Sequence, residues 1–197
     1  MIKKILGFDI SSTCIGYSVL EFDDTTNDVK FIKCNYHKPI KKGNILERLY
    51  HTKNIIKKII DDFKPDYIAV EDIIQFMKNK SSAKTVITLA VFNRMIGLLA
   101  HDYLSKSPEL FNVMQIRHGL KKTPVLPKKE EMPELVASHL GIAFPYVYKK
   151  KGNIDSVSED MADSVAVALY CAYVHTGKII LKIKKPKVKK AKKGKKE

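Results

Sequence analysis

Three strand-like runs near the start of the chain constrain its fold more than any other feature. Residues 3–10 and 15–22 are rich in β-branched, aromatic and other apolar side chains and are joined by Ser-Ser-Thr-Cys, a pattern typical of a β-hairpin. A third run, residues 29–36, can extend the hairpin into a meander. We therefore predict that the chain begins with an antiparallel sheet.

The following segments alternate between helix and strand. Residues 45–63 carry apolar side chains at steps of three to four and stop at Lys-Pro-Asp, which predicts an amphipathic helix. We further expect a strand at 67–70, a helix at 82–104, a strand at 111–116, a short helix at 128–140, a loop at 145–155 and a helix at 158–175. This order predicts an α/β fold, a mixed β-sheet with helices on both faces.

The lysine-rich end of the chain differs in composition from the rest. Residues 182–197 hold ten lysines and one glutamate, so they carry +9 of the formal charge of +15 and residues 1–181 keep +6. We predict one folded domain over 1–181 and a disordered tail over 182–197, because the tail repels itself and has few apolar residues. A basic body with a basic tail favours a polyanionic partner, nucleic acid first and an anionic membrane surface second.

The cysteines and the apolar runs indicate the compartment. Cys14, Cys34 and Cys171 are far apart and odd in number, which is typical of a reducing environment rather than a disulfide framework. No uncharged apolar run reaches the ~18 residues that a membrane-spanning helix needs. We expect a soluble intracellular protein without a membrane partner, cytoplasmic or nuclear depending on its host.

Four acidic residues stand out by their positions. Asp9 lies inside the first strand, Glu71 ends the strand that follows the first helix, and Asp160 and Asp163 share one face of the last helix. An ionised carboxylate is costly to desolvate unless it is paired or bound to a cation. If the two strands are neighbours and the last helix crosses them, the four carboxylates converge.

Converging carboxylates favour a site for divalent metal. Hard oxygen ligands suit Mg²⁺, with Mn²⁺ as a substitute, and two such ions ~4 Å apart can promote attack of water on a phosphodiester. Each acid alone has a structural interpretation, because a lone Asp often caps a turn and Asp160 could cap its helix. The histidines offer a competing general base, but nothing in their spacing ties them to the acids, so we interpret them as surface or core residues: His101, His118, His139 and His175.

Four stretches together carry a resemblance to a known family. They are Phe8-Asp9-Ile10 with the following Ile-Gly-Tyr-Ser-Val, Ile68 to Glu71, Phe76-Met77-Lys78-Asn79, and Asp160 to Ala168. As a set they resemble the RuvC-type Holliday junction resolvases, a branch of the ribonuclease H-like and retroviral integrase superfamily. The resemblance spans roughly residues 4–175. A Ser-Ser-Thr turn and a lysine-rich loop before the last helix depart from the family pattern, as in a divergent, viral or phage-like branch.

The resemblance implies a ribonuclease H-like fold and an activity. The expected enzyme is a crossover junction endodeoxyribonuclease that resolves four-way DNA junctions in recombination and repair by paired symmetric nicks. It implies that Asp9, Glu71, Asp160 and Asp163 are catalytic and bind two Mg²⁺ ions. It also implies a homodimer, because a two-fold symmetric junction needs two nicks.

The resemblance also suggests which residues contact DNA. Phe76 matches the family's aromatic residue that stacks at the branch point. The alternative is burial under a helix, but the polar neighbours Gln75 and residues 78–82 favour exposure. Lys78 lies in the same stretch, and Arg117, Lys128 and Lys129 lie where the family has basic residues near the scissile phosphate. A charge run is more often only a solvated surface.

Three other functions compete with this one. An actin-like phosphotransferase would use Asp9 and the Ser-Ser-Thr turn for nucleotide phosphates, but it predicts a second similar domain for which residues 1–181 leave no room. A noncatalytic DNA-binding protein with the same fold predicts the loss of some of the four acids. A related nuclease that acts on flaps, RNA or RNA–DNA hybrids stays open.

Overall fold

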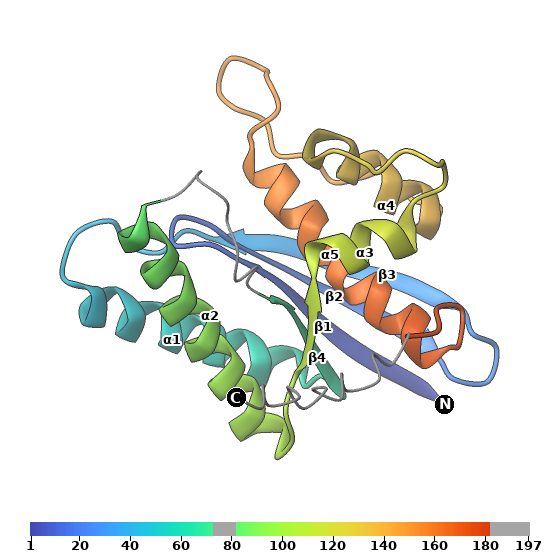
Figure 1. The fold of residues 1–197 in the computed structure, drawn as a ribbon, viewed down its shortest axis with the longest axis horizontal. Coiled ribbons are helices and arrows are strands. Elements are labelled where there is room, and N and C mark those ends of the chain that lie inside the picture. Colours follow the sequence, from blue (N-terminus) through green and yellow to red (C-terminus); the bar gives the residue numbers. More distant parts are fainter. Residues whose placement is uncertain (73–81, 182–197) are drawn as a thin grey trace, which may run out of the picture.

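A five-stranded sheet forms the centre of the structure, a computed structural model that describes residues 1–72 and 82–181 (Figure 1). Its strands are β1 (Ile2–Ile10), β2 (Ile15–Asp23), β3 (Val29–His37), β4 (Tyr67–Asp72) and β5 (Glu109–Asn112), in the order β3-β2-β1-β4-β5. The first three strands pair antiparallel, whereas β4 pairs parallel with β1 and β5 parallel with β4. The predicted meander and the mixed sheet are confirmed.

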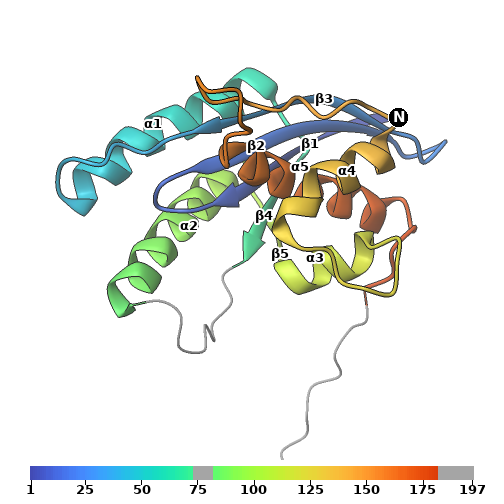
Figure 2. The same cartoon turned by 90° about the horizontal axis from the view of Figure 1, so that it is seen from above.

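Helices cover both faces of this sheet, as predicted (Figure 1, Figure 2). They are α1 (Ile45–Phe63), α2 (Ala83–Leu104), α3 (Val113–Leu120), α4 (Met132–Leu140) and α5 (Val157–His175), with a short 3₁₀ helix η1 (Lys129–Glu131) before α4. Side chains alternate between the faces of a strand, so Leu6 packs with α1 and α2, whereas Ile5 belongs to the core that includes α5. Each face therefore has its own hydrophobic core.

The polar turn between β1 and β2 is stabilised by hydrogen bonds within the turn. Ser11 Oγ accepts hydrogen bonds from the N–H groups of Thr13 and Cys14 at 3.2 and 2.9 Å, and it donates to the Cys14 carbonyl at 2.7 Å. Arg48 of α1 donates to the Ser12 carbonyl at 2.6 Å. The turn that departs from the family pattern is thus a hydroxyl-stabilised hairpin connection, since hydroxyl side chains can satisfy the backbone of a tight turn.

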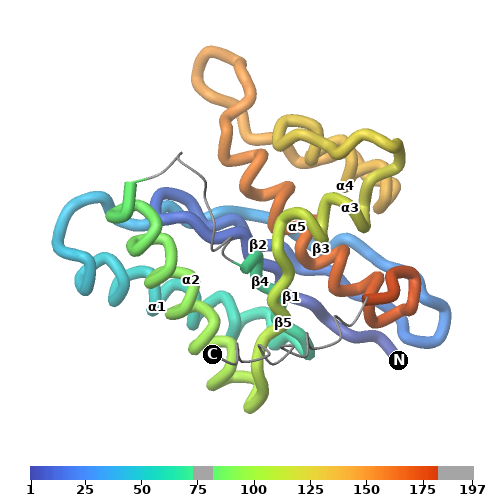
Figure 3. The backbone as a smooth tube through the Cα atoms, viewed as in Figure 1, coloured from blue at the N-terminus to red at the C-terminus, as the bar shows by residue number. Residues whose placement is uncertain are grey.

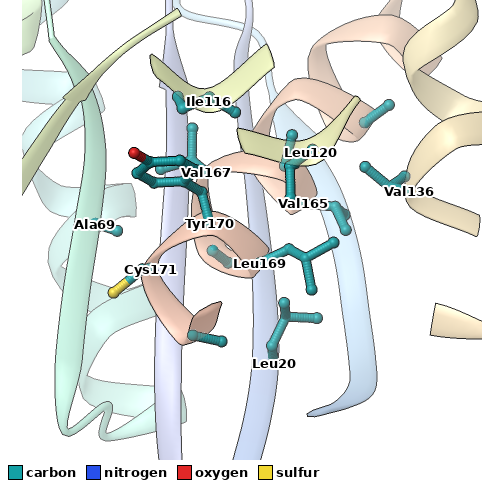
Figure 4. Close-up of a cluster of buried hydrophobic side chains, with 14 of the residues drawn as sticks. Leu20, Ala69, Ile116, Leu120, Val136, Val165, Val167, Leu169, Tyr170 and Cys171 are labelled. Carbon is teal, nitrogen blue, oxygen red and sulfur yellow. The ribbon is translucent and has the colours of Figure 1, made fainter. Parts of the chain in front are cut away.

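Helix α5 is the centre of the larger core. Every residue from Met161 to Ala172 is buried, which is typical of a helix that is covered on all sides. Figure 4 shows Val165, Val167 and Leu169 of this helix among side chains from the sheet and from α3 and α4. Burial of each such side chain contributes roughly 1.5–3 kcal/mol.

Two glycines let α5 lie directly on β1 and β2. A Cβ atom on Gly16 would be 2.0 Å from the carbonyl oxygen of Asp160, and one on Gly7 would be 2.5 Å from that of Ser164. Both distances are far shorter than any van der Waals contact, so a larger residue would force the helix away from the sheet. The close approach positions the beginning of α5, with its acids, over β1.

The predicted strand at 111–116 is wrong from Val113 onward. β5 ends at Asn112, and α3 begins at the next residue. The Asn112 side chain accepts a hydrogen bond from the Gln115 N–H at 2.9 Å, and Gln115 Oε1 accepts one from the Asn112 N–H at 3.1 Å, a capping box that starts a helix. Ile116 and Leu120, four residues apart, are the buried side of α3. A short apolar segment does not reveal whether its period is that of a strand or a helix.

The segment between α4 and α5 projects from the body of the protein (Figure 3). The predicted loop at 145–155 contains one antiparallel bridge, between Tyr148 and Ile154. Its three successive lysines, residues 149–151, are exposed.

Helix α2 is the one helix of the described residues that is long and apolar enough, by length and composition alone, to cross a membrane. Only 22% of its most apolar window is buried. Phe92, Ile96 and Ala100 pack into the core against the sheet and α1. The charged residues Lys84, Arg94 and Asp102 interrupt the apolar sequence of this helix. It therefore contains no uncharged run of membrane-spanning length.

Candidate active site

The four acids come together at one end of the sheet. β1 and β4 are neighbours, and their register pairs Phe8 with Val70, so Asp9 and Glu71 follow side by side on adjacent parallel strands. The first turn of α5, with Asp160, packs over this end because Gly16 faces the Asp160 backbone. The expectation that the two strands are neighbours and that the last helix crosses them is confirmed.

Burial and mutual repulsion dominate the electrostatics of these acids. Burial raises the pKa of Asp9 well above its usual range, and the charges of Glu71 and Asp163 raise it further. Burial and then the charge of Asp163 raise the pKa of Glu71 to about 7, against the opposing effect of Arg117 and Lys129. The pKa of Asp163 is raised to about 6, mainly by burial. Without a further cation, Asp9, Glu71 and Asp163 therefore keep their protons to higher pH than exposed carboxyl groups do.

Two basic residues lie directly against the acids. Lys129 Nζ is 2.6 Å from Asp160 Oδ1 and 3.7 Å from Asp163 Oδ2. Burial alone would lower the pKa of Lys129, but its hydrogen bond to Asp160 and the negative charges around it raise the pKa instead. Arg117 of α3 has a nitrogen 3.9 Å from Asp163 Oδ1 and donates to the Pro127 carbonyl at 3.3 Å.

The donor set fits a hard divalent cation. It offers only carboxylate oxygens, the ligands that Mg²⁺ and Mn²⁺ prefer, and the raised pKa values show that Arg117 and Lys129 do not compensate their charge. Among the residues that the structure describes, no three of the four acids bring their oxygens within 4.8 Å of one another. Lys129 instead lies between Asp160 and Asp163.

The sequence interpretation missed Asn93, which forms a hydrogen bond with the backbone of Glu71. Asn93 of α2 is buried, and its side-chain amide donates to the Glu71 carbonyl at 2.8 Å. The next residue, Arg94, pairs with Asp72 at 3.1 Å. An amide side chain in the middle of an apolar helix was the available signal, because a buried polar group needs a hydrogen-bonding partner.

The residues expected to contact DNA have different outcomes. Phe76 and Lys78 lie outside the described residues. Arg117 and Lys129 lie among the acids, as described above. Lys128 is exposed, and its backbone N–H donates to the Glu131 carboxylate at 2.7 Å.

Comparison with known proteins identifies relatives over most of the chain. Residues 5–117 match the family described as crossover junction endodeoxyribonuclease RuvC. The RuvC of Wigglesworthia glossinidia brevipalpis is 30% identical over 180 residues, which cover 88% of this chain and 96% of the relative. The RuvC of Finegoldia magna is 28% identical over 169 residues, covering 84% and 90%.

Solved structures share the fold. A structure of Thermus thermophilus RuvC in complex with Holliday junction substrate has a TM-score of 0.64 at 19% sequence identity and covers 90% of this chain and 97% of its own. The yeast mitochondrial Holliday junction resolvase has a TM-score of 0.59 at 13% identity, with 87% and 78% covered. At such low identity the likeness concerns the fold, a ribonuclease H-like mixed sheet.

Proposed function

This chain belongs to the RuvC family of crossover junction endodeoxyribonucleases, and we propose that it resolves four-way DNA junctions as a metal-dependent, structure-selective endonuclease. One observation carries the proposal beyond family membership. Asp9 and Glu71 are the penultimate residues of adjacent parallel strands, which lie beneath the first turns of α5 with Asp160 and Asp163. Asp163 is buried and the other three acids are partly buried, and such an excess of carboxylates is expected where a site binds cations.

The four acids would hold two Mg²⁺ ions, for which Mn²⁺ can substitute. Such ions supply Lewis acidity for the attack of water and for the negative charge on the leaving oxygen. Glu71 and Asp163 must lose any bound proton before they serve as ligands, so cation binding is coupled to proton release near neutral pH. Asn93 holds the backbone end of β4 and thereby orients Glu71.

Basic side chains would receive the phosphate backbone. Lys129 and Arg117 adjoin the acids, so we assign them to the scissile phosphate and Lys128 to a neighbouring one. Phe76 would stack on a base at the branch point, a contact worth ~1–3 kcal/mol, with Lys78 beside it on the backbone. The net charge of +15 supports a nucleic-acid substrate through the release of counterions.

We assign the exposed apolar side of α2 to a homodimer interface. Ile87 and Leu98 are 63% and 61% exposed, and Val91 and Tyr103 lie partly exposed on the same helix. A second copy fits this surface better than a bilayer does, because Arg94 and Asp102 on the same helix are charged and exposed. Leu98→Glu should shift the protein from dimer to monomer in sedimentation velocity measurements, whereas an unchanged sedimentation coefficient would exclude this interface.

We also place the protein inside the cell, in the cytoplasm or the nucleus according to its host. The three cysteines are all free and buried, which supports a reducing compartment. In that compartment, we expect its partner to be branched DNA.

The decisive experiment replaces Asp9 with Asn. Asp9→Asn should abolish Mg²⁺-dependent nicking of a synthetic four-way junction and leave junction binding intact, because the amide keeps the shape and removes a charged ligand. Asp61→Asn, which changes an exposed acid of α1, is the matched control and should cleave like the wild type. Nicking by Asp9→Asn at the wild-type rate would refute the assignment.

A substrate panel separates the alternatives. The wild-type protein should cut the junction at paired symmetric positions and faster than a flap, an RNA–DNA hybrid or a plain duplex. Preference for a flap or hybrid would identify the related nuclease instead, and binding without cleavage of any substrate would identify a noncatalytic DNA-binding protein.

A further inference from the structure

A second group of potential metal ligands lies at the opposite end of α5 from the acids. Glu109 begins β5, and Cys171 and His175 lie in the last turns of α5. A helix rises about 1.5 Å per residue, so Asp160 and His175 are about 22 Å apart along the axis. The group is therefore separate from the carboxylate site.

The three side chains point at one another. Cys171 and His175 are four residues apart and share one face of the helix. His175 Nε2 is 2.5 Å from Glu109 Oε1, and Cys171 Sγ is 3.7 Å from Glu109 Oε2. Figure 4 shows the Cys171 sulfur projecting from α5 toward the side where Ala69 of β4 lies, and Ala69 pairs in register with Glu109.

This arrangement is not repeated in the part of the chain that the structure describes. Among the His, Cys, Asp and Glu side chains in residues 1–72 and 82–181, these form the only group of three or more whose ligand atoms all lie within 4.8 Å of one another. Ligand atoms around a tetrahedral zinc ion are about 3.3–3.8 Å apart, as bond lengths of about 2.0–2.3 Å require. Small rotations of the side chains would reach that geometry.

The chemistry of the three ligands differs from that of the carboxylate site. Cys171 supplies sulfur, His175 supplies nitrogen, and Glu109 supplies oxygen. Thiolate and imidazole ligands favour zinc-type ions, whereas all-oxygen ligands favour Mg²⁺. Three protein ligands with a fourth position open to solvent are a common zinc arrangement.

The surroundings orient the ligands and leave a route for an ion. The His175 ring lies 4.2 Å from the Tyr67 ring and is stacked on Phe22 at 5.9 Å, measured between centroids. The side chains of His175 and Glu109 are 27% and 29% exposed, whereas Cys171 is fully buried behind them. An ion can therefore enter from solvent past the first two residues and reach the sulfur.

Without an ion, the Cys171 thiol keeps its proton. Burial and then the charge of Glu109 raise the pKa of this thiol well above its usual range. The thiol donates a hydrogen bond to Glu109, and His175 contacts the other carboxylate oxygen. Coordination would form a metal–sulfur bond and release the thiol proton to water.

We propose that Glu109, Cys171 and His175 form a second metal site, which takes one zinc-type divalent cation and links the end of α5 to the edge strand β5. The site is independent of the proposed nuclease function. Because it would hold together segments far apart in the sequence, the bound ion should stabilise the folded protein.

Co²⁺ is the probe for the test. One equivalent is added to the reduced full-length protein in excess Mg²⁺, so that the carboxylate site is not available to cobalt. We expect a thiolate-to-cobalt charge-transfer band that Zn²⁺ removes. Cys171→Ser and His175→Asn should lose this band, whereas Cys34→Ser, which changes another buried cysteine, should keep it.

Thermal denaturation tests whether a variant loses the band only because it fails to fold. Zn²⁺ should raise the Tm of the wild type and of Asp9→Asn, but not that of His175→Asn, whose circular dichroism should match the wild type because the side chain is partly exposed. Absence of the band in the wild type overturns the proposal. The proposal is also overturned if the charge-transfer band persists in both Cys171→Ser and His175→Asn, or if Asp9→Asn loses the band.

Discussion

At the scale of single residues, the proposed function gives Lys129 two roles in the site. It forms ion pairs with Asp160 and Asp163 that offset part of their negative charge, and under the proposed function it would also contact the scissile phosphate. Its side chain is 43% exposed, so solvent weakens both ion pairs. A substitution at this position should therefore affect catalysis more than stability.

Lys129→Gln should slow nicking on the order of 10²-fold, because a cation beside the developing charge is lost. The free energy of unfolding should fall by only about 1 kcal/mol. Single-turnover cleavage and urea denaturation measure the two effects. Lys58→Gln, at an exposed position of α1 that has no role in the proposed site, is the matched control; equal rates for both variants would contradict the role of Lys129.

The acids make the metal-free protein sensitive to pH. Glu71 and Asp163 have pKa values of about 7 and about 6 in the folded protein, whereas in the unfolded chain such groups titrate near 4. Between about pH 4 and pH 7 the folded state therefore binds more protons than the unfolded state, so its free energy of unfolding falls as pH rises. Metal binding should counteract this loss, because the cation compensates the ionised carboxylates.

Glu71→Gln should remove part of this dependence. With EDTA present, the urea midpoint of the wild type should decrease more between about pH 5 and pH 8 than that of the variant, because the amide does not titrate. Glu130→Gln, at an exposed position, should behave like the wild type. Parallel curves for wild type and Glu71→Gln would show that Glu71 does not titrate in this range.

At the scale of secondary structure, the contact of α5 with the hairpin depends on glycine. Gly16→Ala would place its methyl group 2.0 Å from the Asp160 carbonyl, so α5 must move. We expect a loss of roughly 3 kcal/mol or more in the free energy of unfolding and slower cleavage, because Asp160 moves with the helix. Thermal denaturation and the nicking assay measure both.

Gly97→Ala is the matched control for that change. A Cβ at Gly97 of α2 meets nothing within 4 Å, so alanine should stabilise the helix by about 0.5–1 kcal/mol. If Gly16→Ala were as stable as this control, the close packing of α5 on β2 would be refuted.

Local patterns predicted most elements but not the contacts between them. The helix at 45–63 was correct at both ends, because its apolar period is regular, Asn44 caps its start and Pro65 follows its end. Helix α3 was missed, since a short apolar segment fits either period. The Lys129 contact with Asp160 could not be deduced, because it depends on how η1 packs beside α5.

Because local patterns do not predict contacts between elements, the sequence indicated only one of the two candidate metal sites. The acids were recognisable because carboxylates in strands conflict with their surroundings, and their roles in catalysis stay predictions. Glu109, Cys171 and His175 gave no such signal. Cys and His are ordinary residues in an apolar helix, and their relation to Glu109 exists only once α5 lies across the sheet.

At the scale of the whole molecule, positive charge is concentrated at the end of the chain. Residues 182–197 carry +9 of the net charge, so deletion of this segment should weaken DNA binding and reduce its dependence on salt. Binding isotherms at several salt concentrations would measure the slope. Nicking by the truncated protein should persist, since all four acids lie in residues 1–181, and complete loss of activity would contradict that domain assignment.

The proposed catalytic residues come from the first strand and the last helix of the fold. Asp9 lies on β1, whereas Asp160 and Asp163 lie on α5, which also supplies the centre of the larger core. During synthesis on the ribosome, β1 emerges first and must wait for α5 before that core can form. Translation that stops before Val157 would therefore yield a chain that lacks two of the four proposed catalytic acids, so we expect an incomplete product not to cut DNA.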